Sequence, residues 1–119
     1  MKILILDDDP DISEILKDIC ESFGAKPVVC DSGEEALDTL KEQHFDLIFS
    51  DIFMPKMDGI EFTEAVRKLG ITIPIIIISA GGRRNIEAFN RALKHGATEL
   101  LEKPFGISEI KDLFDKYKS

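Results

Sequence analysis

Acidic residues follow two separate apolar segments of this chain, and their carboxylates could act together. Segment 2–6 runs into Asp7 and Asp8, and segment 45–50 runs into Asp51. Near-continuous apolar runs are typical of buried parallel strands, and ligand chemistry in open α/β sheets gathers at the strands' carboxyl ends. Carboxylates gathered there would repel by about 4 kcal/mol per close pair. We therefore expect them to hold a hard divalent cation, and Mg²⁺ is typically bound by carboxylates, phosphate oxygens and water.

A hydroxyl and an ammonium group complete the candidate site. Ser79 ends an apolar strand predicted over 74–78, and Lys103 follows a shorter strand predicted over 98–101. A carboxylate can act as a nucleophile, while a metal ion and a lysine can stabilise charge on a transferring phosphoryl group. The set of side chains therefore indicates phosphoryl transfer.

Strands and helices alternate along the chain, and their order predicts how these residues are positioned. The pattern predicts strands over 2–6, 26–29, 46–50, 74–78 and 98–101, and helices over 10–23, from Ser32, over 60–69, over 83–94 and from Gly106 or Ser108. Such alternation implies a parallel sheet with helices on both faces. For five strands we expect the flavodoxin-like (βα)5 fold with strand order 2-1-3-4-5. Its switch point lies between the first and third strands, which are those that end in aspartates.

Local signals refine two of these assignments. Asp9 before Pro10 is interpreted as a helix cap and not as a third metal ligand. The apolar residues of this first helix, Ile15 among them, follow at helical spacing. Asp58-Gly59 is interpreted as a turn in which the glycine takes a positive φ.

Composition narrows the class of protein. The chain has 119 residues, 44% hydrophobic and 32% charged, which is typical of one globular domain over 1–119. A net charge of −8 argues against nucleic acid as a partner. No apolar run reaches the length of a membrane span, no signal peptide is evident, and Cys20 and Cys30 are expected to be free thiols in the cytoplasm. The chain ends after the fifth predicted helix, so we expect no attached output domain.

Four short segments together resemble the receiver domain of bacterial two-component response regulators. They are 5–10, 50–59, 77–80 and 102–105, and they occur in the family's order across essentially the whole chain. Each segment alone is a weak signal, but four at the expected strand ends make a strong one.

The resemblance implies a role for each site residue. Asp51 resembles the phosphoacceptor, which takes a phosphoryl group from a sensor histidine kinase or a histidine phosphotransfer protein. Ser79 and Lys103 are similar to the residues that bind phosphoryl oxygens. Such a domain is consumed stoichiometrically, so we expect a phosphorylation-controlled switch or relay and not an enzyme in the usual sense.

The resemblance also implies the ligands of Mg²⁺. These are Asp7, Asp8, Asp51 and the backbone carbonyl of Phe53, with Asp8 the preferred direct ligand of the acid pair. In most relatives the peptide bond that corresponds to Lys103-Pro104 is cis.

The chain departs from the family pattern before the site lysine. Most relatives carry an aromatic residue three positions earlier, where this chain has Leu100. We hypothesise that closure of the loop at Gly81-Gly82, and not rotation of an aromatic ring, carries the signal.

The predicted fourth helix is basic on an otherwise acidic chain, with Arg83, Arg84, Arg91 and Lys94. One interpretation is a solvated face, which is the usual fate of helix charges. The other is a surface, formed with the fifth strand, that docks a downstream protein target after phosphorylation.

Two further functions fit parts of the pattern. An aspartate-nucleophile phosphatase of the haloacid dehalogenase type would use Asp7 and Asp9 but leaves Asp51 unexplained. A flavodoxin-like nucleotide carrier would need a phosphate-binding loop, whereas bare carboxylates repel phosphate.

Overall fold

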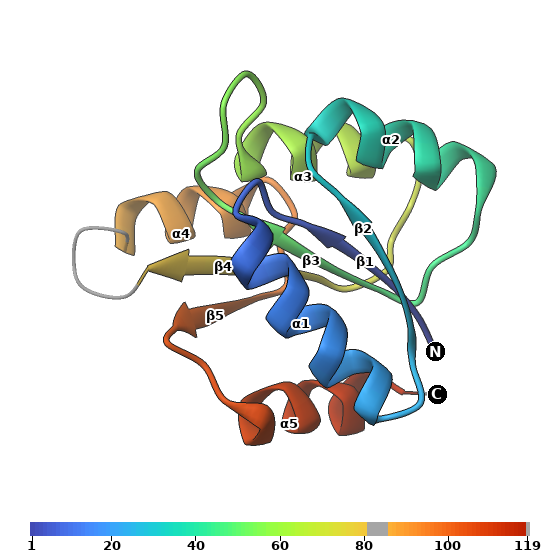
Figure 1. Cartoon of the computed structure of the whole chain (residues 1–119). Coiled ribbons are helices and arrows are strands. Elements are labelled where there is room, and N and C mark those ends of the chain that lie inside the picture. Colours follow the sequence, from blue (N-terminus) through green and yellow to red (C-terminus); the bar gives the residue numbers. More distant parts are fainter. Residues whose placement is uncertain (81–85, 119) are drawn as a thin grey trace.

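The computed structural model describes residues 1–80 and 86–118, and in these ranges strands and helices alternate (Figure 1). The strands are β1 (Lys2–Leu6), β2 (Lys26–Cys30), β3 (Leu47–Asp51), β4 (Ile75–Ala80) and β5 (Glu99–Lys103). The helices are α1 (Pro10–Ser22), α2 (Gly33–Glu42), α3 (Gly59–Lys68), α4 (Ile86–Lys94) and α5 (Ile107–Tyr117). Over the described residues, none of these helices combines the length and apolarity that crossing a membrane requires.

The sheet has the predicted topology. All neighbouring strands are parallel, in the order β2-β1-β3-β4-β5. Leu6 of β1 pairs with Ser50 of β3, so the next residues of the two strands, Asp7 and Asp51, meet at the same edge. The flavodoxin-like fold is therefore confirmed, and its switch point is acidic.

Two layers of helices cover the sheet. Helices α1 and α5 pack on one face, and α2, α3 and α4 pack on the other (Figure 1). The run 75–78 in β4 is completely buried, because alternate isoleucines enter the two cores. Such two-sided burial is the reason that the central strands are near-continuous apolar runs.

Several predicted boundaries were wrong by a few residues. Strand β5 extends to Lys103, because β4 extends to Ala80 and the two residues pair. Strand β3 begins one residue later than expected, at Leu47. The Asp46 carboxylate before it accepts a hydrogen bond from the Lys2 backbone N–H at 2.8 Å. Ile15 fits the helical spacing of α1 but is 48% exposed. The first residues of the predicted fourth helix, 83–85, lie outside the described residues.

The predicted helix ends are confirmed where capping chemistry was used. Asp9 is the N-cap of α1, and its Oδ1 accepts from the Asp11 N–H at 3.0 Å. Gly24, Gly70 and Gly96 follow α1, α3 and α4 with φ of 80°, 83° and 111°, the left-handed conformation that glycine adopts at helix ends.

Arg67 ties the end of α3 to two neighbouring turns. Its guanidinium donates to the carbonyls of Ile71 and Ile73 at 2.9 and 2.8 Å, and to the carbonyl of Gly96 at 3.0 and 2.8 Å. We expect Arg67→Met to lower the free energy of unfolding by about 2 kcal/mol, because partly buried carbonyls lose their donors. Urea unfolding measures this, with the exposed Arg91→Met in α4 as the control. Equal effects of the two substitutions would contradict the role assigned to Arg67.

Candidate functional site

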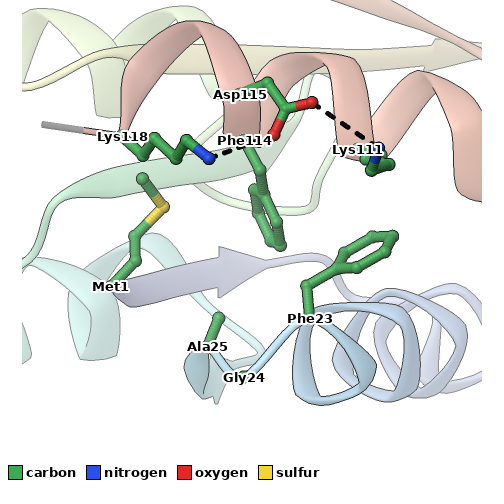
Figure 2. A pocket seen from close by; sticks show the side chains of 8 residues that line it. All are labelled: Met1, Phe23, Gly24, Ala25, Lys111, Phe114, Asp115 and Lys118. Carbon is green, nitrogen blue, oxygen red and sulfur yellow. Dashed lines mark ion pairs between the residues drawn. The ribbon is translucent and has the colours of Figure 1, made fainter.

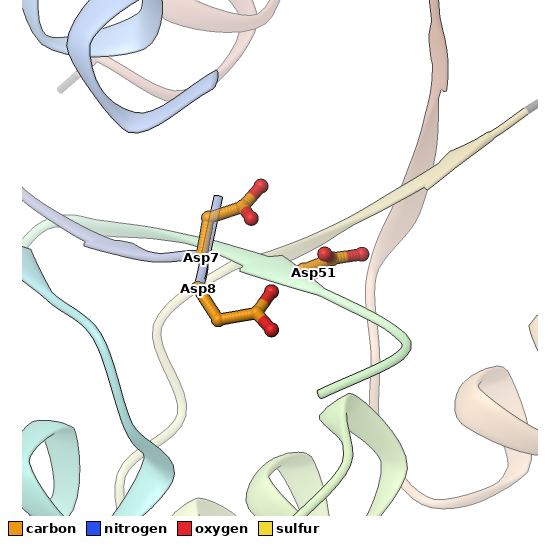
Figure 3. Close-up of side chains that lie close together, drawn as sticks. All are labelled: Asp7, Asp8 and Asp51. Atoms are coloured by element: carbon orange, nitrogen blue, oxygen red, sulfur yellow. The ribbon is translucent and has the colours of Figure 1, made fainter. Parts of the chain in front are cut away.

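Three carboxylates gather where β1 and β3 end. Asp7 and Asp8 directly follow β1, and Asp51 is the last residue of β3. One oxygen from each carboxylate lies within 4.8 Å of the others (Figure 3). Asp7 and Asp51 are buried, whereas Asp8 is exposed. The structure thus brings together the three side chains that the sequence predicted as metal ligands.

The Asp7 carboxyl is protonated more readily than an ordinary aspartate. Burial, followed by the negative charge of Asp51, raises its pKa from 3.8 to about 6, against the opposing hydrogen bond from the Asp9 backbone. Burial also raises the pKa of Asp51, although Lys103 and the backbone N–H groups of Phe53 and Ile52 oppose this. Two acids this close are costly to charge together.

Lys103 faces both buried acids. Its Nζ lies 3.8 Å from Asp7 Oδ2 and 3.9 Å from Asp51 Oδ2. The lysine reaches them from the end of β5, because β4 carries the ladder from β3 to β5. The Lys103-Pro104 peptide bond is cis. One ammonium therefore pairs with two of the three carboxylates, so the cluster is negatively charged overall when all three acids are ionised.

Ser79 and Phe53 lie near the cluster in different settings. Ser79 is 1% exposed in β4, one residue beyond Ile78, the partner of Asp51 in the ladder. Phe53 lies two residues beyond Asp51, and its side chain is 58% exposed. The role of Ser79 toward a phosphoryl group and that of the Phe53 carbonyl toward a metal remain predictions.

The acid cluster suits a hard divalent cation. Asp7 Oδ1 accepts from the Asp9 N–H at 2.9 Å, whereas the buried Asp7 Oδ2 has no hydrogen-bond partner within the described chain. An unsatisfied buried carboxylate oxygen is costly. Mg²⁺ is typically bound by carboxylate oxygens and keeps several of its water ligands. Asp7, Asp8 and Asp51 would therefore hold it.

Gly59 lets α3 begin directly against the end of β3. A Cβ on this glycine would lie 2.3 Å from the Asp51 carbonyl oxygen and 2.9 Å from the Ile52 Cα. The prediction of a positive φ at Gly59 was wrong, because Gly59 is the first residue of helix α3. The positive φ in this loop belongs to Lys56, at 68°. Glycine is required here for close approach to the backbone. Asp58 is the N-cap of α3 and forms a capping box with Glu61.

The proposed switch elements are only partly described. Leu100 is half-buried and packs against the core beneath α2, α3 and α4. Gly81 and Gly82, on which the loop hypothesis rests, lie outside the described residues, as do Arg83 and Arg84.

Sequence reasoning missed Ser13, a buried polar residue beside the cluster. Its hydroxyl donates to the Asp7 backbone carbonyl at 3.1 Å. Ser13 shares the buried side of α1 with Leu16 and Cys20. A serine in phase with apolar residues at i+3 and i+7 was the signal that could have found it.

An open parallel sheet with an acidic site at its switch point defines a doubly wound α/β domain of the flavodoxin-like class. Residues 3–115 match the sequence profile described as "Response regulator receiver domain". The chain belongs to this family, whose domains are phosphorylated by histidine kinases.

The relatives include both response regulators and a sensor kinase. "Probable C4-dicarboxylate response regulator DctR" of Bacillus subtilis (strain 168) is 32% identical over 119 residues, which are 98% of this chain and 52% of that protein. "Sensor histidine kinase RcsC" of Escherichia coli (strain K12) is 35% identical over 117 residues, 98% of this chain and 12% of that protein. The chain thus spans about half or less of these two relatives.

Solved structures agree with the fold. The Vibrio cholerae chemotaxis protein CheY4 superposes with a TM-score of 0.90 at 28% identity, over 98% of each chain. The receiver domain of the Francisella response regulator 1452 gives a TM-score of 0.84 at 35% identity, also over 98% of each chain.

Proposed function

We propose that this protein is a phosphorylation-controlled signalling switch or relay that accepts a phosphoryl group on Asp51 in a Mg²⁺-dependent reaction. The donor is the phosphohistidine of a sensor histidine kinase or of a histidine phosphotransfer protein. The observation that carries this proposal is the cluster itself, with three carboxylate oxygens within 4.8 Å of one another and the Lys103 ammonium 3.9 Å from Asp51.

Each side chain has a role in the proposed transfer. An Asp51 carboxylate oxygen attacks phosphorus, the P–N bond of phosphohistidine breaks, and its electron pair remains on the imidazole nitrogen. Lys103 stabilises negative charge on the transferring oxygens, and the Ser79 hydroxyl donates a hydrogen bond to one of them. Asp7, Asp8, Asp51 and the Phe53 carbonyl would hold Mg²⁺, which would supply positive charge to balance the phosphoryl oxygens.

The phosphorylated form is proposed to bind a downstream protein through α4 and the neighbouring face of β5. Phosphorylation adds roughly −1.5 to −2 charges at the site. In helix α4, Ile86 is 53% exposed and Leu93 is 39% exposed. The same helix also carries the exposed basic residues Arg91 and Lys94. Apolar and basic groups on one helix suit an acidic, partly apolar partner.

We further propose that residues 1–119 form one receiver domain, which acts in the cytoplasm. Its chemistry is confined to acquiring and losing one phosphoryl group, so it is not proposed as an enzyme with turnover. The acidic net charge of −8 is consistent with a protein partner and not with nucleic acid.

Intact-mass measurement tests the phosphoryl transfer directly. The protein is incubated with acetyl phosphate with or without Mg²⁺, and we expect one added phosphoryl group only when Mg²⁺ is present. Asp51→Asn should remain unmodified, while the control Asp38→Asn, an exposed acid of α2, should be modified like the parent protein. Modification of Asp51→Asn would contradict the assigned acceptor. Rapid release of many phosphates per protein that survives Asp51→Asn would instead indicate a phosphatase.

A further inference from the structure

Ser13 is a buried polar residue of α1 whose hydroxyl bonds a residue outside its own helix. The residue is 5% exposed, and its Oγ donates to the backbone carbonyl of Asp7, six residues earlier, at 3.1 Å. A helical serine ordinarily bonds a carbonyl three or four residues back, as Ser22 does with Ile19 at 2.6 Å. The Ser13 bond therefore joins the helix to the residue that begins the acid cluster.

The first turn of α1 also holds the Asp7 carboxylate. The Asp9 N–H donates to Asp7 Oδ1 at 2.9 Å, and Asp9 is itself fixed as the cap that accepts from Asp11. Asp7 Oδ1 is thus occupied, and Asp7 Oδ2 is left toward Lys103 at 3.8 Å. Asp7 is consequently held at two points, by a backbone donor at its carboxylate and by Ser13 at its carbonyl.

The carbonyl that Ser13 holds belongs to the peptide between Asp7 and Asp8. Because a peptide unit is planar, fixing this carbonyl also fixes the amide nitrogen and Cα from which the Asp8 side chain projects. The Asp8 carboxylate is exposed and has no hydrogen-bond or ion-pair partner among the described residues. Among the described residues, no side-chain contact fixes the Asp8 carboxylate, so the position of its backbone matters for its approach to the cluster, and Ser13 holds the peptide that precedes it.

We infer that Ser13 is a positioning residue for divalent-cation binding, which orients the Asp7–Asp8 peptide so that both carboxylates meet Asp51. This inference rests on the proposed function, because it assumes that the acid cluster binds Mg²⁺. Ser13 touches neither the metal nor the phosphoryl group in this role.

A cavity beside Ser13 makes a conservative test possible. Its volume is about 460 Å³, and its lining includes Asp8, Ser13, Lys17, Val29 and Asp31. We expect the extra methyl of threonine to enter this space while its hydroxyl still reaches the Asp7 carbonyl. Alanine removes the donor, and cysteine keeps a similar volume but replaces the hydroxyl by a weak S–H donor.

Isothermal titration with Mg²⁺, using chain first stripped of metal with EDTA, tests the inference. We expect Ser13→Ala and Ser13→Cys to raise the dissociation constant about three- to tenfold, the range of one net hydrogen bond. Ser13→Thr should stay within about twofold of the parent protein, because the hydroxyl bond is kept. Ser22→Ala, which removes a serine hydroxyl at the far end of the same helix, should leave the constant unchanged.

Urea unfolding in EDTA separates positioning from a merely structural role. If Ser13→Ala or Ser13→Cys is folded and binds Mg²⁺ as the parent protein does, the inference is wrong, whatever the loss of unfolding free energy. A threonine variant as weak as the alanine variant would also overturn it. Absence of Mg²⁺ binding by the parent protein is a different result, which removes the proposed function itself.

Discussion

At neutral pH and without divalent cations, we expect Asp7→Asn to be more stable than the parent protein, by about 2 to 3 kcal/mol. The buried Asp7 carboxyl has its pKa raised from 3.8 to about 6. Asparagine keeps an oxygen that can accept from the Asp9 N–H and removes the charge that burial penalises. The same change should abolish most of the stabilisation by Mg²⁺, which for an intact site is about 2.7 kcal/mol at one hundred times the dissociation constant.

The pH dependence of this difference has a definite sign. Because the folded pKa of Asp7 exceeds its ordinary value of 3.8, the native state binds more protons than the unfolded chain between these pH values. The contribution of Asp7 to stability therefore falls as pH rises from about 4 to 6 and stays at its low value above that. Asp7→Asn lacks this fall. The difference in unfolding free energy between the variant and the parent protein should therefore grow as the pH rises from about 4 to 6.

Urea unfolding of both proteins from pH 4 to 8, in EDTA and in Mg²⁺, measures the effect. The difference between the two proteins isolates Asp7 from other acids, such as Glu99, whose pKa is lowered by Lys116 and Tyr117 despite its partial burial. Asp38→Asn serves as the exposed-acid control. The account of the cluster is wrong if Asp7→Asn is less stable than the parent protein at neutral pH in EDTA.

The sequence could predict the elements that depend on local chemistry. Asp9 was identified as a cap because its neighbour Pro10 suits a first helical turn, and the structure places it there. The meeting of Asp7 with Asp51 followed from strand order alone, since parallel neighbours end at one edge. Local signals and topology were sufficient for the acid cluster because its residues lie at strand ends.

Features that depend on contacts between distant segments were not predictable in the same way. The extent of β5 depends on where β4 ends. The residues of segment 98–103 themselves contain no pattern that predicts this end. Gly33 permits close approach of Met57, whose Sδ would lie 2.6 Å from an added Cβ, and the two are far apart in sequence. A glycine in a turn motif such as Asp58-Gly59 has two explanations, positive φ or close packing, and only the structure separates them.

Gly59→Ala should cost about 3 kcal/mol of unfolding free energy, near the upper end for inserting one methyl into a packed site. The added Cβ would meet the Asp51 carbonyl oxygen at 2.3 Å and the Ile52 Cα at 2.9 Å. Both atoms are backbone, so neither can swing aside as the end of a side chain could. The first turn of α3 cannot easily retreat, because Gly59 donates to Ile52 at 2.8 Å and accepts from Thr63 at 2.7 Å.

Gly70→Ala is the matched control for this substitution. Gly70 has φ of 83° with no atom within 4 Å of an added Cβ, so alanine there meets only the cost of the left-handed conformation, about 1 kcal/mol. Relief of the clash at Gly59 must displace the backbone of Asp51, so Gly59→Ala should also weaken Mg²⁺ binding, whereas Gly70→Ala should not. Urea unfolding and calorimetric titration of both variants measure the two effects. Similar losses of stability with unchanged Mg²⁺ affinity would show that α3 does not need this close contact to set the end of β3.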